Sequence, residues 1–211
     1  MRIENYLIEL KNRGFYPKSI LDIGANVGEF GKFCKNLFPT SNILMIEGND
    51  NCESDLKMTG LNYKICLLGD TKRKVQFHLN PENNKCTGSS YYKEVTHHYN
   101  QSVIVEKELQ LLDEVNQNSF DLIKIDTQGS ELDIIKGGLE TIKKAKYVIL
   151  EAPVKEYNIG SPKLDEIITF MQSIGFNEYE EIEKHHWYSP NKEFEYGEVF
   201  QIDLSFKNSN I

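Results

Sequence analysis

Four acidic residues stand at the ends of apolar runs that are short enough to be buried strands. They are Glu47, Asp70, Asp126 and Glu151. In an open α/β sheet the carboxyl ends of the parallel strands meet at one edge, and ligands bind outside that edge. Four unrelated spacings therefore predict carboxylates at the same edge. Carboxylates placed there could bind ligand hydroxyl groups or take a proton from a reacting group.

A glycine turn follows the first of the apolar runs, residues 20–23. Gly24 and Gly28 stand four positions apart, and the apolar residues Phe30 and Phe33 then resume at a helical interval. Glycine permits positive φ and close approach of a ligand, and the helix that follows directs free N–H groups toward the turn. This pattern is typical of the opening of a nucleotide-binding unit. Taken alone, this pattern is weak evidence for a binding site, because a structural tight turn is the more common explanation.

The residues within the turn indicate which class of nucleotide it would bind. A dinucleotide-binding fingerprint requires glycine at its third and sixth positions, where this chain has Asn26 and Glu29. A carboxylate at the start of the helix would repel a pyrophosphate. NAD is therefore disfavoured, and a cofactor that carries a positive centre fits better.

The second apolar run, residues 42–47, ends in Glu47, 23 positions after Gly24. An acid at about this distance from the glycine turn lies at the tip of the second strand, where it accepts hydrogen bonds from ribose hydroxyls. A solvated strand end is the alternative interpretation of Glu47. Asp70 follows the third run, and we expect it either near the adenine edge of the nucleotide or in a capping turn.

Four segments together resemble the FkbM-type family of S-adenosylmethionine-dependent methyltransferases. They read DIGANVGEF from Asp22, IEGN around Glu47, IKIDTQGSELDIIKGG from Ile123 and VILEA from Val148. The first segment is shared by many class I methyltransferases, whereas the third is more particular to this family. The similarity covers roughly residues 18–152. Many members have a proline where this chain has Gly48.

The resemblance implies a fold, a reaction and a set of cofactor contacts. The fold is the Rossmann-like class I methyltransferase fold, an α/β architecture with a seven-stranded, mostly parallel sheet, helices on both faces and an antiparallel closing hairpin. The reaction is usually O-methylation, here of a small molecule or a sugar or glycan unit, with S-adenosylmethionine as donor and S-adenosylhomocysteine as product. The residues expected to bind the cofactor are Asp22, Gly24, Asn26, Gly28, Glu47, Gly48, Asn49, Asp70 and Asp126.

Asp126 is predicted to be the main acid on the acceptor side. A hydroxyl acceptor loses its proton as it attacks, which requires a base or a metal. Lys124 shares a strand face with Asp126, so the two could pair, and Asp126 could alternatively cap the helix that begins near Ser130. Asp126, Glu151 and Lys124 are the expected catalytic residues.

A hard cation such as Mg²⁺ between Asp126 and Glu151 is a less favoured alternative, because only the more distant Glu131 could act as a third ligand. The acceptor is expected to contact four further positions. These are Ser89, Tyr91, Glu131 and Tyr157. Ser89 and Tyr91 lie in residues 80–101, a polar, aromatic and turn-rich segment whose length suggests an active-site loop.

Composition restricts the class of protein. The chain has 211 residues and a net charge of −8, with a pI near 5.2. Nucleic-acid binders usually present a basic face, so we expect no nucleic-acid partner. The four cysteines are dispersed, and no apolar run approaches the roughly 18 residues of a membrane span. We expect a reduced, cytoplasmic protein with one methyltransferase domain over residues 1–211, in which residues 1–17 form a helix and lead-in.

Periodicity predicts the remaining elements. Helices are expected over residues 3–13, 28–37, 50–58, 130–144 and 163–174, and strands over residues 62–68, 74–79, 102–109, 119–126 and 147–150, with a closing pair at 177–188 and 198–206. The oligomeric state is left open. An N-methyltransferase, another nucleotide-dependent enzyme, or a cofactor-binding module without catalysis are the alternatives to the O-methyltransferase.

Overall fold

The main sheet contains seven strands in the order β3-β2-β1-β7-β8-β10-β9. The computed structural model describes residues 2–79, 88–96, 102–116, 118–188 and 194–211. The five strands from β3 to β8 are parallel, and β10 runs antiparallel to both β8 and β9. This confirms the predicted mixed sheet and its closing hairpin. The strands are β1 Ser19–Ile23, β2 Asn42–Glu47, β3 Asn62–Ile65, β7 Leu122–Ile125, β8 Tyr147–Pro153, β9 Glu178–His186 and β10 Val199–Lys207.

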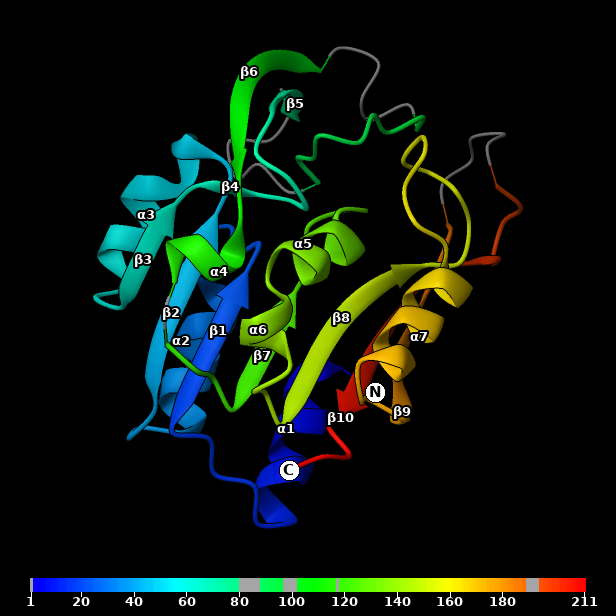
Figure 1. Cartoon of the computed structure of the whole chain (residues 1–211). Helices are drawn as coiled ribbons and strands as arrows, with labels where there is room; N and C mark the ends of the chain where they lie inside the picture. Colours follow the sequence, from blue (N-terminus) through cyan, green and yellow to red (C-terminus); the bar gives the residue numbers. More distant parts are fainter. Residues whose placement is uncertain (1, 80–87, 97–101, 117, 189–193) are drawn as a thin grey trace.

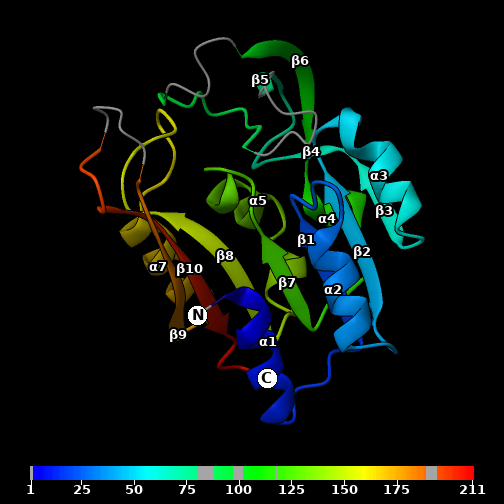
Figure 2. The same ribbon diagram turned by 180° about the vertical axis from the view of Figure 1, so that it is seen from behind.

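Helices cover both faces of this sheet (Figures 1 and 2). On one face lie α1 and α2, and beside β3 a short 3-10 turn, Asp50–Cys52, leads into α3. On the other face lie α4, α5, α6 and α7. The helices are α1 Ile3–Asn12, α2 Glu29–Leu37, α3 Glu53–Met58, α4 Leu112–Val115, α5 Glu131–Gly137, α6 Leu139–Ile142 and α7 Leu164–Ser173.

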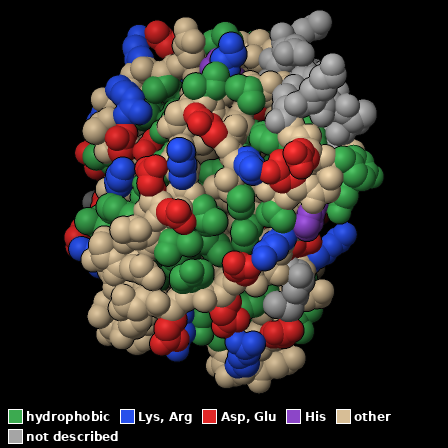
Figure 3. Space-filling view, turned by 90° about the vertical axis from the view of Figure 1, so that its right-hand side faces the viewer, with side chains coloured by type: hydrophobic (Ala, Val, Ile, Leu, Met, Phe, Trp, Pro, Cys, Tyr) green, Lys and Arg blue, Asp and Glu red, His purple; other side chains and the backbone are tan. Residues whose placement is uncertain are grey.

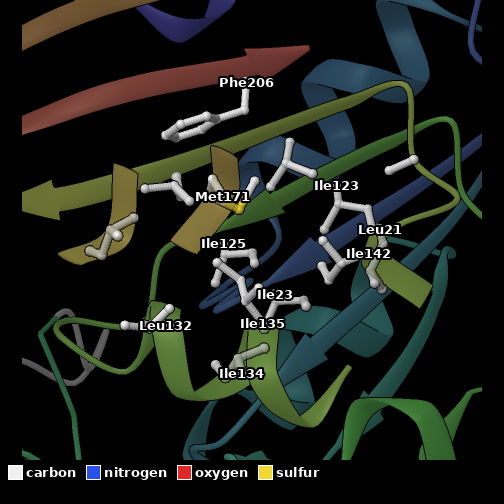
Figure 4. Close-up of a cluster of buried hydrophobic side chains, with 14 of the residues drawn as sticks. Leu21, Ile23, Ile123, Ile125, Leu132, Ile134, Ile135, Ile142, Met171 and Phe206 are labelled. Atoms are coloured by element: carbon white, nitrogen blue, oxygen red, sulfur yellow. The ribbon is translucent and has the colours of Figure 1, made fainter. Parts of the chain in front are cut away.

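The central strands are apolar on both sides because helices cover both sides. Alternate residues of β1 belong to different cores: Leu21 and Ile23 face α5 to α7, whereas Ile20 faces α1 and α2. Figure 4 shows the first of these cores, in which residues of β1 and β7 meet helical residues such as Ile134 and Met171. The two cores hold the strands in register and so set the positions of the strand ends.

A second, three-stranded sheet lies beyond the carboxyl ends of β1 and β2 (Figure 1). Its order is β4-β6-β5, formed by Leu67–Leu68, Val103–Gln110 and Lys74–Leu79. The single strand predicted over residues 62–68 is therefore wrong: the chain leaves the main sheet after β3, and β4 pairs with β6. A Cβ on Gly48 would lie 2.6 Å from Leu67 Cδ1, so the small sheet approaches the tip of β2 closely.

The long helix predicted over residues 130–144 is also divided, into α5 and α6. The break lies at Gly137 and Gly138, where other segments come very near the backbone. A Cβ on Gly137 would lie 2.0 Å from the carbonyl oxygen of Gly69, and one on Gly138 would lie 2.5 Å from Leu112 Cδ2. The helix is interrupted where it packs against the chain that leads into the small sheet and against α4.

The described helices do not include one that is long and apolar enough to cross a membrane. Cys34 and Cys66 are free thiols, the thiol of Cys52 donates to Asn26 Oδ1 at 4.0 Å, and Cys86 lies outside the described residues. On the face shown in Figure 3, acidic and basic side chains are interspersed among hydrophobic ones. The charges of that face are therefore mixed in sign over the residues that the structure describes.

Candidate active site

The turn after β1 brings the ends of three strands together. The amides of Gly24 and Ala25 both donate to the carbonyl of Ile46, at 2.9 and 3.1 Å. Gly24 has φ of +75°, and a Cβ there would lie 1.8 Å from the carbonyl oxygen of Asp126. Asn26 also has positive φ, at 49°. Only glycine can occupy position 24, because it needs both the left-handed conformation and the close approach of β7.

Glu47, at the tip of β2, lines the site, and its carboxylate also holds the turn after β1 in place. Its Oε2 accepts a hydrogen bond from the amide of Asn26 at 2.7 Å, and its Oε1 accepts one from the amide of Asn49 at 2.8 Å. Burial raises the pKa of its carboxyl, and the two amides oppose that rise. Glu47 is therefore a buried acid held in place, not a solvated strand end.

A cavity of about 230 Å³ lies over the ends of β1, β2 and β7. Seven of the predicted site residues line it: Gly24, Asn26, Glu47, Gly48, Ser89, Tyr91 and Asp126. Leu68 and Phe77 of the small sheet contribute apolar side chains to the lining of this cavity. A carboxylate at one end and apolar side chains around it suit a ligand that has both hydroxyl groups and a flat apolar ring.

A more open groove of about 890 Å³ adjoins this cavity on the face of the sheet that carries α1 and α2. Three residues line both spaces, namely Gly24, Asn26 and Asp126. The groove also contains Lys124 and Glu151. The two spaces thus meet at the glycine turn and at the end of β7.

Lys124 forms a buried ion-paired group with two aspartates. Its Nζ lies 3.2 Å from Asp126 Oδ2, 3.6 Å from Asp22 Oδ1 and 5.3 Å from the ring centre of Phe30. Burial alone would lower the pKa of Lys124, but the two aspartates raise it overall. The predicted pairing of Lys124 with Asp126 is present, and it explains how a charged residue lies within a central strand.

The carboxylate of Asp126 has a second contact, with Gln128. The Nε2 of Gln128 donates to Asp126 Oδ1 at 3.1 Å and to Glu151 Oε2 at 2.7 Å. Desolvation would raise the pKa of Asp126, but Lys124 and the amide of Gln128 outweigh it, so this pKa lies below its ordinary value. Asp126 is therefore ionised at neutral pH and bridged to Glu151 by one amide.

Glu151 is held by a second amide. The Nε2 of Gln201 donates to Glu151 Oε2 at 2.6 Å. Burial raises the pKa of Glu151 well above its ordinary value, and the negative charges of Asp126 and Asp203 add to that rise. Glu151 thus has a fixed position in an acidic surrounding.

Four residues that were predicted to bind the cofactor lie outside the linings of both spaces. Asp22 is fully buried and pairs with Lys124, Gly28 is the residue immediately before α2, and the amide of Asn49 is bound to Glu47. Asp70 forms an ion pair with Arg73 and also accepts from Thr71. Asp70 therefore belongs to the turn between β4 and β5, where its carboxylate is neutralised. This is the second of the two places expected for it, and its contact with the cofactor stays a prediction.

The residues predicted to contact the acceptor also divide into those that line the cavity and those that do not. Glu131 is buried and accepts from the amides of Thr127 at 2.8 Å and Gly129 at 3.0 Å, so it braces the loop after β7. Tyr157 is buried and paired with Gln201. Neither residue lines the cavity or the groove, and both support neighbouring residues; their contact with an acceptor stays a prediction.

Ser89 and Tyr91, which belong to the segment at residues 80–101, line the cavity, and their contact with an acceptor stays a prediction. The hydroxyl of Tyr91 donates to Asp133 Oδ2 at 2.7 Å, which ties this segment to α5. Residues 80–87 and 97–101 lie outside the described residues. Of the described part of this segment, residues 88–91 line the cavity, and its role as an active-site loop stays a prediction.

Four polar residues of the site were not predicted: Gln128, Gln201, His185 and Asp203. His185 and Asp203 both line the groove, and His185 Nε2 lies 3.0 Å from Asp203 Oδ2. The sequence contained a signal for Asp203, because a charged residue within an apolar, alternating strand is unusual. Lys124 gives the same signal in its own strand. Gln128 lies within the quoted family segment. Its backbone has a positive φ of 57°, and its side-chain amide donates to the carboxylates of Asp126 and Glu151.

Solved structures with the same overall architecture share little sequence with this chain. The methyltransferase FkbM of Methylobacillus flagellatus has 16% identity and a TM-score of 0.58, over 90% of this chain but 43% of that protein. A putative O-methyltransferase of Klebsiella pneumoniae has 12% identity and a TM-score of 0.52, over 98% of this chain and 78% of that one.

A third similar structure is the N-terminal domain of EvdMO1 in the presence of S-adenosylhomocysteine and D-fucose. It has 10% identity and a TM-score of 0.51, over 99% of this chain and 84% of that one. No curated protein matches the chain by sequence. At these identities the structural similarities show the fold alone.

The family is shown by sequence. Residues 22–178 match the model of the methyltransferase FkbM domain, and this range contains the glycine turn, Glu47, Asp126 and Glu151. It runs from the first strand of the site to the start of β9 and so includes the strand ends that form the cavity. The chain belongs to the FkbM family of methyltransferases.

Proposed function

We propose that the chain is an S-adenosylmethionine-dependent O-methyltransferase that acts on a hydroxyl group of a small molecule, with a sugar or glycan unit as the preferred acceptor. The main observation behind this proposal is that the cavity and the groove meet at Gly24, Asn26 and Asp126. One space suits a nucleoside and the other contains an ionised carboxylate, so a donor and an acceptor would meet beside Asp126.

The chemistry of the cavity lining supports S-adenosylmethionine as the cofactor. Gly24 and Gly48 leave backbone without Cβ atoms at its edge, and Glu47 offers a carboxylate to ribose hydroxyls. Leu68 and Phe77 offer apolar wall to an adenine ring. Its volume of about 230 Å³ is somewhat below that of most ligand pockets, which lies at roughly 300–1,000 Å³, and the adjoining groove adds the remaining room. When bound, S-adenosylmethionine supplies a methyl group carried by a positively charged sulfonium.

The residues at the junction would act mainly by positioning. Asp126, ionised beside Lys124, would orient an acceptor hydroxyl and accept its proton. Lys124 keeps this carboxylate in place and ionised. Glu151, fixed by the amides of Gln128 and Gln201, would contact the acceptor from the next strand. The similarity to a domain studied with D-fucose supports a sugar as the acceptor class.

The test is methyl transfer from S-adenosylmethionine labelled in its methyl group to a panel of sugars, hydroxylated small molecules and amines. Transfer of label to a sugar hydroxyl is the expected result. Transfer to amines alone would show an N-methyltransferase instead. Calorimetric binding of S-adenosylhomocysteine without transfer to any acceptor would favour a cofactor-binding module without catalysis.

A further inference from the structure

Three carboxylates stand side by side across β8, β10 and β9. Asp203 is the register partner of Glu151 on one side and of Glu183 on the other. Cross-strand partners project from the same face of a sheet, and like charges that are directly opposite destabilise it. Such a row requires compensating positive charge nearby.

His185 adds a nitrogen ligand to this row. It follows Glu183 by two positions on β9 and so projects from the same face. Its Nε2 lies 3.0 Å from Asp203 Oδ2 and 3.9 Å from Glu151 Oε1. Glu151, His185 and Asp203 each offer one ligand atom, and these atoms all lie within 4.8 Å of one another. We call these three residues the EHD cluster.

We propose that the EHD cluster binds a divalent transition-metal ion, with Mn²⁺ favoured over Mg²⁺. Metal–ligand bonds of about 2.1 Å place ligands at right angles roughly 3.0 Å apart, which is the separation of His185 Nε2 and Asp203 Oδ2. An imidazole nitrogen suits transition metals, whereas Mg²⁺ prefers an all-oxygen set. Two carboxylates and one imidazole would leave the other coordination positions to water or to a ligand.

The surroundings of the cluster support an ion. Gln128 and Gln201 both donate to Glu151 Oε2, which fixes the carboxylate with its Oε1 toward His185. Such second-layer hydrogen bonds are what orients the ligands of metal sites. The described lining of the groove contains six acidic side chains, Glu4, Glu29, Asp126, Glu151, Glu183 and Asp203, and the two basic residues Arg2 and Lys124. This excess of negative charge would attract a cation.

The cluster differs from the Mg²⁺ site considered from the sequence. That site joined Asp126 to Glu151 and lacked a nearby third ligand, whereas the structure provides two further ligands from β9 and β10. An ion in the groove would bind oxygen atoms of an acceptor and hold it beside Asp126. This role in the reaction rests on the proposed function, but binding of the ion does not.

The experiment measures Mn²⁺ alone, with the full chain in the absence of cofactor and acceptor. Bound Mn²⁺ loses the sharp electron paramagnetic resonance signal of the free ion, so a titration gives stoichiometry and affinity. We expect saturation at one ion per chain. His185→Ala and Glu151→Gln should each weaken binding about tenfold or more.

His186→Ala is the matched control. His186 is the next residue on β9, projects from the opposite face, and bonds through Nδ1 to the carbonyl of Gly197 at 2.9 Å. It should keep the affinity of the wild type. Equal weakening by His185→Ala and His186→Ala, or binding by the wild type that never saturates, would overturn the proposal.

A second measurement needs no variant and so does not depend on how a variant folds. In the wild type, titration with diamagnetic Zn²⁺ should shift the imidazole NMR signals of His185 and leave those of His186 nearly unchanged, and equal shifts of both would contradict the site. Calorimetry with S-adenosylhomocysteine, run in parallel without metal, tests the cofactor cavity separately. Failure of the metal site and failure of the proposed function would therefore be distinguished.

Discussion

Asp126 is the residue on which the proposed chemistry depends most. It lines both the cavity and the groove, and its two carboxylate oxygens contact Lys124 and Gln128. Asp126→Asn keeps the shape of the side chain but removes its charge and its ability to accept a proton. We expect turnover to fall by about 10²-fold or more, the range of general acid–base catalysis, with little change in cofactor affinity.

Steady-state methyl transfer and calorimetry with S-adenosylhomocysteine measure the two quantities. Asp165→Asn on the exposed first turn of α7 serves as a control and should leave both unchanged. Turnover near that of the wild type in Asp126→Asn would remove Asp126 as the base. Activity abolished by a chelator and restored by a divalent ion would instead place part of this role on bound metal.

Glu47 is proposed to contact the cofactor, and it also accepts hydrogen bonds from the turn amides. Two substitutions separate these two roles. Glu47→Gln removes the charge and keeps one acceptor oxygen, but it places an NH2 donor against the second turn amide. We therefore expect weaker binding of S-adenosylhomocysteine by about 1.5–3 kcal/mol and a smaller loss of unfolding free energy than in Glu47→Ala. Glu47→Ala also leaves the amides of Asn26 and Asn49 unpaired, so it should in addition lower the free energy of unfolding by about 1–3 kcal/mol.

Calorimetry and urea unfolding of the two variants test this division. A dissociation constant for Glu47→Gln equal to that of the wild type would show that the carboxylate serves the turn only.

At the scale of elements, the β1–α2 turn depends on the absence of a side chain at Gly24. Gly24→Ala would place a Cβ 1.8 Å from the carbonyl of Asp126 at φ of +75°, whereas Gly60→Ala would meet the same strain at φ of +70° with nothing within 4 Å. Gly60→Ala should therefore cost only the conformational strain, about 1–3 kcal/mol. Gly24→Ala should cost more and should also abolish cofactor binding, because β1 and β7 must separate. Equal unfolding free energies for the two variants would contradict this account.

Asp121 joins the other end of the same two strands. Its Oδ2 accepts from the amide of Lys18 at 2.6 Å, and its Oδ1 lies 3.1 Å from Lys146 Nζ. Desolvation would raise the pKa of Asp121, but the amide of Lys18 and the charge of Lys146 lower it overall. A lowered pKa in the folded state stabilises the protein above the ordinary pKa near 3.8, and this stabilisation is lost as the pH falls through the folded value.

Asp121→Asn should accordingly destabilise the protein at pH 7 by about 1–2 kcal/mol. The difference from the wild type should shrink below about pH 4, where the wild-type carboxyl also becomes neutral. Unfolding free energies measured from pH 3 to pH 7 test this, and a difference that does not depend on pH would contradict it.

The whole molecule should discriminate between nucleotide cofactors by charge. The groove is rich in acidic side chains, Glu29 begins α2, and the amide of Asn26 is already bound to Glu47. A sulfonium is attracted by this site, whereas a pyrophosphate would meet carboxylates, and the turn amides of Gly24, Ala25 and Asn26 already have acceptors. We expect S-adenosylmethionine and S-adenosylhomocysteine to bind in the micromolar range and NAD far more weakly. Calorimetry that gave equal or tighter binding of NAD would exclude the proposed cofactor.

Much of the architecture follows from the sequence alone because it depends on local patterns. Apolar runs of strand length, helical spacing and glycine stops give the order of the elements along the chain. The glycine turn and the acid at the tip of β2 follow from the same patterns, since a strand that is buried on both faces must place its polar end residue at the rim. For this reason the places of Gly24, Glu47 and Asp126 at the strand ends could be predicted from the sequence.

Only the tertiary structure decided which polar groups meet. The last strand, β10, lies between β8 and β9, and this order places Asp203 between Glu151 and Glu183 and within reach of His185. Alternation tells which residues share a strand face, but it does not tell which strands are neighbours. The same limit applies to Asp70, whose neutralisation by Arg73 depends on the turn into the small sheet, and to Glu131, whose carboxylate is occupied by amides of the loop after β7.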